Sequence, residues 1–127
     1  MALYAQTSGA HTTDSATFTP IPGLSVTVPG GVDTSALVIV NLPNPYATGN
    51  NFPGGNIGVS IDGAVSPVFA SFTYNEQVPP STGRIPTTLV VGVPLIMEKQ
   101  VVQAVWCGVR GSTVHIDSPS TLSVVFS

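Results

Sequence analysis

Glycine and proline interrupt this chain at short intervals along its whole length. The 127 residues include 13 glycines and 12 prolines, in clusters such as Pro22-Gly23 and Pro53-Gly54. The segments between them are short and rich in Val, Ile, Leu, Thr and Phe, which is typical of strands bounded by turns. No stretch keeps apolar residues at helical spacing over three turns. The sequence therefore predicts an all-β protein without a substantial helix.

Eight or nine such segments fit strands of a single domain that spans residues 1–127. Their predicted bounds are residues 16–19, 24–28, 36–41, 57–61, 68–74, 87–93, 101–110, and 113–116 with 121–126. A small domain with this many strands favours two packed antiparallel sheets, as in a jelly roll or sandwich.

Two of these segments are apolar on both faces. Residues 36–40 and 101–106 lack the alternation that a strand shows when one of its faces meets water. The second face is covered either inside the domain or by another subunit. The chain has only three Lys and Arg and six Asp and Glu, so little charge opposes self-association. The pattern therefore favours an assembly of identical subunits.

The small number of charges also excludes several classes of protein. The cations are Lys99, Arg84 and Arg110, and the net charge is −3. Three scattered cations supply neither the phosphate contacts of a nucleic-acid-binding protein nor a polybasic membrane anchor. No apolar run reaches the roughly 20 residues of a membrane helix, so no membrane insertion is expected. We expect a soluble protein without a signal peptide, which leaves non-classical export or display at a cell surface open.

Residue patterns typical of catalytic or metal sites are sparse. His115 and Asp117 have the i, i+2 spacing that puts two side chains on one face of a strand. The sequence has no nucleophile elbow to complete a Ser-His-Asp site, so we interpret this as a hydrogen-bonded pair that fixes a loop or a site wall. The six carboxylates are dispersed along the sequence, so we expect neither the carboxylate pair of a glycosidase nor a metal site. No cofactor is expected. Cys107 lies beside Trp106 in an apolar run and is predicted to be a buried, inert thiol.

Both arginines occupy turns with polar neighbours. Arg84 follows a Pro-Pro-Ser-Thr-Gly segment just before a predicted strand, and Arg110 lies in a Val-Arg-Gly-Ser turn. Residues 45–53 form a long polar loop with two aromatic side chains. A neutral sugar needs planar hydrogen-bond donors, short hydroxyls and an aromatic ring for its C–H face. These turns therefore fit a carbohydrate site, and the alternative is two surface arginines without a role.

A set of segments in this chain has the order and most of the spacings of one known family. The segments are residues 45–54 (PYATGNNFPG), Phe72-Thr73-Tyr74, Ser81-Thr82-Gly83-Arg84 with Pro86, Trp106, Val109-Arg110-Gly111-Ser112 and His115-Ile116-Asp117-Ser118. Together they closely resemble the N-terminal domain of the two-domain superlectins of Burkholderia. That domain is a TNF-like jelly roll that forms a trimer. It binds L-fucose and fucosylated oligosaccharides of H-type and Lewis-type at clefts between neighbouring subunits, without calcium.

The resemblance implies the same fold and homotrimer here, with fucosylated glycans as partners and a site shared between two subunits. One subunit supplies Tyr46, Ser81, Thr82 and Arg84, and its neighbour supplies Thr73, Tyr74 and Arg110. The family places a tyrosine near the sugar where this chain has Asn56 or Ile57. His115, Asp117, Glu76 and Asn56 are expected around these contacts, and Asp117 or Glu76 offsets the desolvation of the arginines.

Two other functions fit the sequence less well. A structural trimer, such as a fibre knob or an adhesin tip, would keep the fold without the sugar site. An enzyme acting on glycans would need a carboxylate pair or a nucleophile, and none is visible. The sequence therefore predicts a lectin rather than an enzyme.

Overall fold

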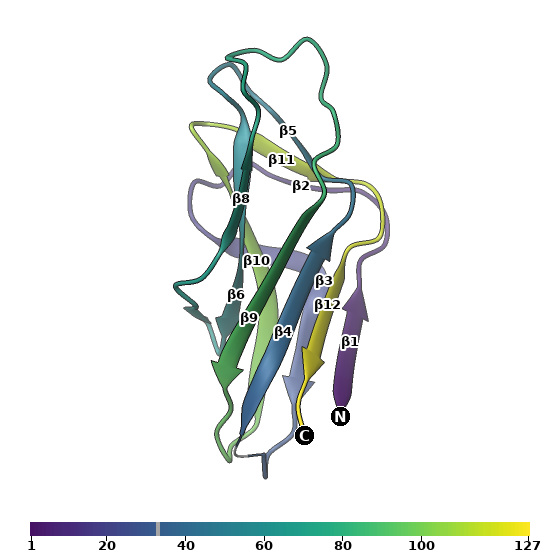
Figure 1. The fold of residues 1–127 in the computed structure, drawn as a ribbon, viewed down its shortest axis with the longest axis vertical. Coiled ribbons are helices and arrows are strands. Elements are labelled where there is room, and N and C mark those ends of the chain that lie inside the picture. Colours follow the sequence, from purple (N-terminus) through teal and green to yellow (C-terminus); the bar gives the residue numbers. More distant parts are fainter. Residues whose placement is uncertain (33) are drawn as a thin grey trace.

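The computed structural model describes residues 1–32 and 34–127, and among these residues it contains twelve strands and no helix (Figure 1). The strands are β1 (Ala2–Gln6), β2 (His11–Thr13), β3 (Thr19–Val28), β4 (Ser35–Leu42), β5 (Tyr46–Thr48), β6 (Gly54–Ile61), β7 (Ala64–Val65), β8 (Ala70–Thr73), β9 (Thr87–Pro94), β10 (Gln100–Val109), β11 (Thr113–Ile116) and β12 (Thr121–Val125). The all-β prediction is confirmed. No described segment is a helix long and apolar enough to cross a membrane.

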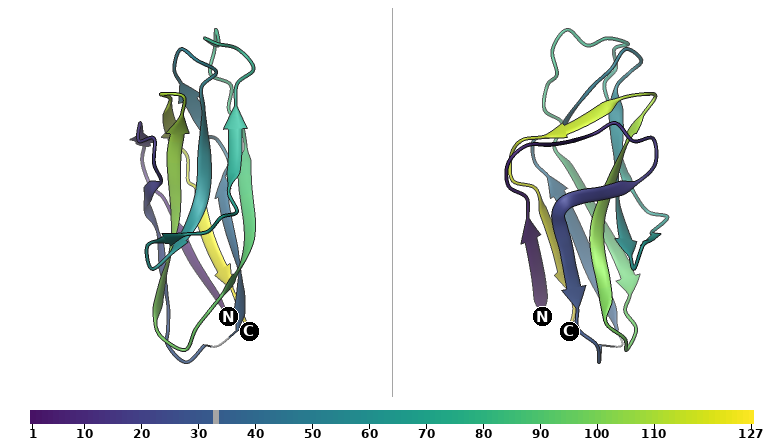
Figure 2. Two further views of the ribbon diagram at one scale, coloured as in Figure 1. Left: turned by 90° about the vertical axis from the view of Figure 1, so that its left-hand side faces the viewer. Right: turned by 180° about the vertical axis from the view of Figure 1, so that it is seen from behind.

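Two antiparallel sheets form the two layers of the molecule (Figure 2). The first has the strand order β1-β12-β4-β9, and the second has the order β3-β10-β6-β7. In the second sheet, β8 pairs with the first half of β6, whereas β7 pairs with its last two residues. A third sheet, β2-β11-β5, crosses one end of the sandwich. The prediction of two sheets is therefore incomplete. The third sheet positions the candidate site, because β5 and β11 carry several of its residues.

The core lies between the two main sheets. Val38 and Val40 of β4 and Leu122 of β12 face Ile57 of β6 and Trp106 of β10, and each of these side chains is at most 1% exposed. Alternating burial along β9 shows that this strand turns one face to the core. Every second residue from Thr87 to Val93 is buried, and the residues between them are exposed. Each fully buried Val or Leu contributes about 1.5–3 kcal/mol of hydrophobic free energy, so this interface dominates the stability of the domain.

The two strands that are apolar on both faces differ in how their outer faces are covered. On β10, Val105 and Cys107 are buried within the chain. The ring of Phe18 and the side chain of Val105 both come within 3.3 Å of the place that a Cβ on Gly58 would occupy. The loop between β2 and β3 therefore covers this half of β10, and the expectation that a subunit covers it is wrong. On β4, Leu37 stays 45% exposed in the single chain.

Several predicted strand bounds need correction. Residues 16–18 lie in a loop, and the next predicted segment, residues 24–28, belongs to the longer β3 that begins at Thr19. The loop predicted at residues 45–53 contains β5, while β1, β2 and β7 were not predicted. The strand predicted at residues 68–74 is shorter. The strands at β4, β6, β9, β10, β11 and β12 are confirmed to within a few residues.

The two chain ends and the long loops lie at opposite ends of the sandwich (Figure 1). The terminal amino group of Met1 donates to the carbonyl oxygen of Phe126, and the Phe126 amide donates back to Met1 at 2.9 Å. The loop after β5 and the long loop before β9 reach the other end and are joined there by the bond from the Phe52 amide to the carbonyl of Gln77. Arg110 of the β10–β11 turn donates to the carbonyls of Asn51 and Phe52. All the candidate ligand-binding residues lie on or next to these loops.

Candidate functional site

Strand pairing places His115, Tyr46 and Arg84 in a row. His115 of β11 and Tyr46 of β5 are direct partners in the antiparallel register. On the other edge of β5, the amide of Ile85 donates to the carbonyl of Pro45 at 3.1 Å. The segment before β9 therefore runs beside β5, and Arg84 comes to lie across Tyr46 from His115.

The aromatic ring of Tyr46 is stacked between the other two side chains. The His115 ring is 4.5 Å from it and nearly parallel, at 7°, and the Cζ of Arg84 is 4.2 Å from the centre of the Tyr46 ring. Arg84 Nη2 also donates to Asp117 Oδ2 at 2.9 Å, and Nη1 donates to the carbonyl of Asn44 at 3.2 Å. We call Asn44, Tyr46, Arg84, His115 and Asp117 the Tyr46 cluster. Cation–π stacking and the ion pair together fix the plane of the guanidinium.

The predicted hydrogen-bonded pair of His115 and Asp117 is wrong. His115 Nε2 instead lies 3.0 Å from the hydroxyl of Thr48, and Asp117 binds Arg84. Both residues still form the wall of the cluster. Burial lowers the pKa of His115 from its ordinary 6.5, the Arg84 charge lowers it further, and Asp117 partly opposes the shift. Among the described residues Arg84 pairs with Asp117 alone, and the exposed Glu76 forms no ion pair.

Arg110 organises a second cluster at the same end. Its Nε donates to the carbonyl oxygens of Phe52 at 3.0 Å and Asn51 at 3.1 Å, and its Nη2 donates to Thr73 Oγ1 at 2.9 Å and again to Phe52. The turn that carries Arg110 has positive φ at Arg110 (51°) and at Gly111 (74°). We call Asn51, Phe52, Thr73 and Arg110 the Arg110 cluster.

Tyr74 connects the two clusters. Its hydroxyl donates to the carbonyl of Gly83, next to Arg84, while its amide donates to the carbonyl of Pro53 at 2.9 Å. Burial raises the pKa of the Tyr74 hydroxyl, so this group remains a hydrogen-bond donor at neutral pH. Within one chain, the loop that carries Ser81 and Thr82 is therefore tied to the loop that carries Phe52.

Asn56 is the residue that can meet a ligand where the family has a tyrosine. Ile57 is fully buried in the core, whereas Asn56 points to the other face of β6 and accepts a hydrogen bond from Ser71 at 2.6 Å. Cys107, opposite Asn56 in the β10–β6 register, is 4% exposed, and burial raises the pKa of its thiol. The prediction that this thiol is buried is confirmed, and its raised pKa lowers the fraction of reactive thiolate.

The two clusters and the nearby loop that carries Ser81 and Thr82 offer hydrogen-bond donors suited to uncharged oxygen acceptors. Within residues 1–32 and 34–127, Arg84 Nε and Arg110 Nη1 donate to no acceptor, and the hydroxyls of Ser81 and Thr82 form no hydrogen bond. In the same residues, no three His, Cys, Asp or Glu side chains gather as metal ligands. A groove of about 460 Å³ lies elsewhere, between β9 and the β6–β7 turn, and contains none of the predicted site residues.

A sequence profile of the Bc2l-C N-terminal domain matches residues 3–125. The chain belongs to this family. The resemblance to the N-terminal domain of the Burkholderia lectins is thereby confirmed. A search of curated protein sequences found no significant match.

Solved structures show the same fold as this member of the Bc2l-C N-terminal domain family at low sequence identity. The Eiger TNF of S. frugiperda has a TM-score of 0.55 and 12% identity, over 99% of this chain and 92% of that one. The C-terminal domain of EclA, described as a sugar-binding protein, has a TM-score of 0.51 and 10% identity over 91% and 78%. The CBM36-1 domain of a xylanase from the hindgut metagenome of Trinervitermes trinervoides has a TM-score of 0.50 and 14% identity over 100% and 98%. The TNF-like fold prediction is confirmed.

Within this Bc2l-C N-terminal domain, sequence reasoning missed the groups that hold the two arginines. Arg84 is held partly by the carbonyl of Asn44, and Arg110 mainly by the carbonyls of Asn51 and Phe52. Backbone acceptors carry no residue-type signal, so no pattern in the sequence could reveal them. Thr48, whose hydroxyl contacts His115, was missed too. It lies within residues 45–54, the segment that resembles the family, and this was the signal that could have identified it.

Proposed function

We propose that this chain is a lectin domain for L-fucose and fucosylated oligosaccharides of H-type and Lewis-type, without enzymatic activity. Each ligand would bind in a cleft between adjacent subunits of a trimer, without calcium. The observation that carries the proposal is the pair of oriented guanidinium groups, Arg84 and Arg110, at one end of a member of the Bc2l-C N-terminal domain family. The sugar binding named for one structural neighbour, the C-terminal domain of EclA, agrees with it.

The charge around Arg84 favours a neutral ligand. Asp117 already balances the guanidinium at 2.9 Å, and both side chains are about two-fifths exposed. An ion pair this exposed adds little stability, so its effect is to orient the remaining N–H donors. A neutral sugar hydroxyl can accept from such a donor without displacing the carboxylate, whereas an anionic ligand would compete with Asp117.

An exposed apolar face supports the trimer. Tyr4, Leu37, Val90 and Val125 point outward from the sheet β1-β12-β4-β9 and are each 43–60% exposed. Leu37 and Val125 are direct cross-strand partners. None of these four strands contains Asp, Glu, Lys or Arg. An uncharged face with several exposed apolar side chains is typical of an interface between subunits.

The division of the site follows from this assembly. The Tyr46 cluster of one subunit would face the Arg110 cluster of its neighbour, so that one sugar receives donors from both arginines. Asn56 lies on the outward face of β6 opposite Ser71 of β8, two residues from Gly54, which pairs with Thr73. A monomer would present each cluster on an open surface and would not bind fucose measurably.

Titration calorimetry with L-fucose and with D-mannose, together with light scattering, tests the proposal. We expect a particle near three times 13.0 kDa that binds L-fucose, rejects D-mannose and is unaffected by EDTA. A monomer at micromolar concentration, or binding that EDTA removes and calcium restores, would contradict it. A trimer that binds no fucosylated glycan on an array would instead identify a structural knob.

A further inference from the structure

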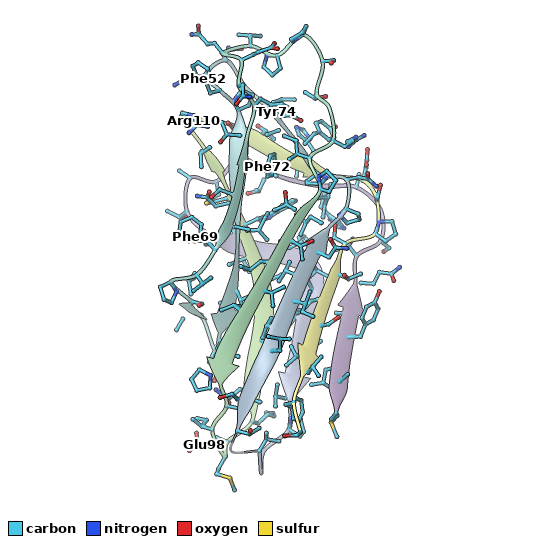
Figure 3. All side chains as sticks on the ribbon, viewed as in Figure 1. Phe52, Phe69, Phe72, Tyr74, Glu98 and Arg110 are labelled. Atoms are coloured by element: carbon cyan, nitrogen blue, oxygen red, sulfur yellow. The ribbon has the colours of Figure 1, made fainter. Side chains whose placement is uncertain are left out.

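The ring of Phe52 stands exposed at the loop end of the molecule. Its side chain is 42% exposed, and Figure 3 shows it near Arg110 and Tyr74, whereas Phe69 lies further down the sandwich. An exposed Phe gives up much of the hydrophobic free energy that its ring gains on burial. At this position the ring is therefore available to a ligand.

The backbone that carries this ring is strained and firmly held. Phe52 has a φ of 47°, which is rare for a bulky residue without a special constraint. Its amide donates to the carbonyl of Gln77 at 3.1 Å, and its carbonyl accepts from Arg110 Nε at 3.0 Å and from Nη2. The next residue, Pro53, is buried and accepts from the Tyr74 amide. Strain that persists under so many contacts is a common property of binding sites.

The same guanidinium that holds Phe52 is one of the two arginines of the proposed fucose site. Arg110 donates to Phe52 and Thr73 through Nε and Nη2, and its Nη1 donates to no acceptor in the described residues. A ligand at Nη1 would therefore bind the same guanidinium that holds the backbone of Phe52. The fucose hydroxyls would accept hydrogen bonds from the free N–H groups of Arg110. A sugar unit linked to the fucose would then extend along the loop end, where the Phe52 ring offers an apolar surface without charge.

We propose that Phe52 forms an aromatic subsite that stacks on the C–H face of the sugar unit linked to the fucose. The proposal rests on the fucose site described above and adds the selectivity for oligosaccharides over the monosaccharide. Covering the exposed part of one phenyl ring corresponds to roughly a five- to tenfold gain in affinity, once the cost of ordering the second sugar is included.

The test compares two ligands on matched variants by titration calorimetry: L-fucose, and a trisaccharide that ends in α1,2-linked fucose. The measured quantity is the ratio of their association constants. We expect this ratio to fall about five- to tenfold in Phe52→Ala and to be kept in Phe52→Tyr. Phe69→Ala removes another phenyl ring, which is 49% exposed, and serves as the control. We expect it to leave the association constants of both ligands unchanged.

Each result separates this proposal from the fucose site itself. A parent that binds no fucose refutes the fucose site. A parent that binds fucose but gains nothing from the trisaccharide refutes the subsite alone. Equal losses for both ligands in Phe52→Ala would show that the residue only positions Arg110. Loss of the oligomer in this variant, measured by light scattering, would show that the ring packs against a neighbouring subunit. Either of these results would overturn the subsite.

Discussion

The acceptors that hold Arg84 and Arg110 bind only some of the N–H groups of each guanidinium and leave the others free for a ligand. A hydrogen bond from a charged group contributes about 1.5–3 kcal/mol, and millimolar to micromolar affinity corresponds to only about 4–8 kcal/mol. Arg84→Lys and Arg110→Lys are therefore expected to abolish measurable fucose binding in calorimetry, while light scattering gives the same particle mass as for the parent. An ammonium cannot stack on Tyr46 and bind Asp117 in the same plane.

The third cation of the chain provides the control for these two variants. Lys99 lies in the turn before β10, at the end of the molecule that is opposite to both arginines. Lys99→Ala removes one positive charge and is expected to leave fucose binding at the parent value. If either arginine variant bound fucose as tightly as Lys99→Ala does, that arginine would lie outside the site.

His115 makes the stability of the domain depend on pH. Its folded-state pKa lies below 6.5 because burial and Arg84 oppose protonation. Between that pKa and 6.5 the unfolded chain binds a proton that the folded chain does not, so the free energy of unfolding decreases as the pH falls through this window. Urea unfolding at fixed protein concentration between pH 5 and 8 should show the decrease in the parent and a smaller one in His115→Gln. Identical curves for the parent and His115→Gln would contradict the assignment.

At the scale of single residues, the sequence identified the donors of the proposed site but not how they are held. Arg84, Arg110 and the hydroxyls around them were identified from turn chemistry and from resemblance. The partner of His115 was mispredicted, because i, i+2 spacing shows only that two side chains share a face. Which of them bonds to what depends on β5 and on the segment before β9, which are distant in sequence.

The pairing of β6 with β8 leaves no space for a side chain at Gly54. A Cβ there would lie 2.2 Å from the carbonyl oxygen of Phe72 and 2.7 Å from Thr73 Oγ1. Gly54→Ala is therefore expected to lower the free energy of unfolding by about 2–3 kcal/mol in urea titrations. Gly83→Ala, in the loop before β9, meets no atom within 4 Å and should change it by less than about 0.5 kcal/mol. Equal stability of the two variants would show that β8 moves freely away from β6.

The strands that the sequence predicted are those with a strong apolar pattern of their own. β4, β9 and β10 carry long Val-rich runs, and their bounds follow from these runs. β5 has three residues in a loop rich in Gly, Asn and Pro, and exists because it pairs with β11. Such short strands depend on a partner far away in the chain, and local pattern cannot predict them.

At the scale of the whole molecule, the uncharged face of β1-β12-β4-β9 predicts how the assembly can be broken. Leu37 lies on β4, an inner strand of this sheet, between Val125 on one side and Gly92 on the other. In Leu37→Lys, an unpaired ammonium would be buried against a neighbouring subunit, so light scattering should find a monomer near 13.0 kDa that no longer binds fucose.

A matched substitution on the opposite sheet tests whether this effect belongs to the face. Val101 of β10 is 38% exposed on the outer side of the second sheet. Val101→Lys is expected to keep the mass and the fucose affinity of the parent. If Leu37→Lys stayed trimeric, the subunits would meet through another surface.

The chain ends and the long loops lie at opposite ends of the sandwich, and this arrangement has a consequence for avidity. Around a three-fold axis parallel to the strands, three clefts would open in one direction, while all six chain ends would point in the other. A surface that carries many fucosylated glycans could then engage several clefts at once. Simultaneous engagement can raise the overall affinity about 10²–10⁴-fold over a single cleft without any new contact. A partner fused to either chain end, or a solid support coupled there, would leave this multivalent end unobstructed.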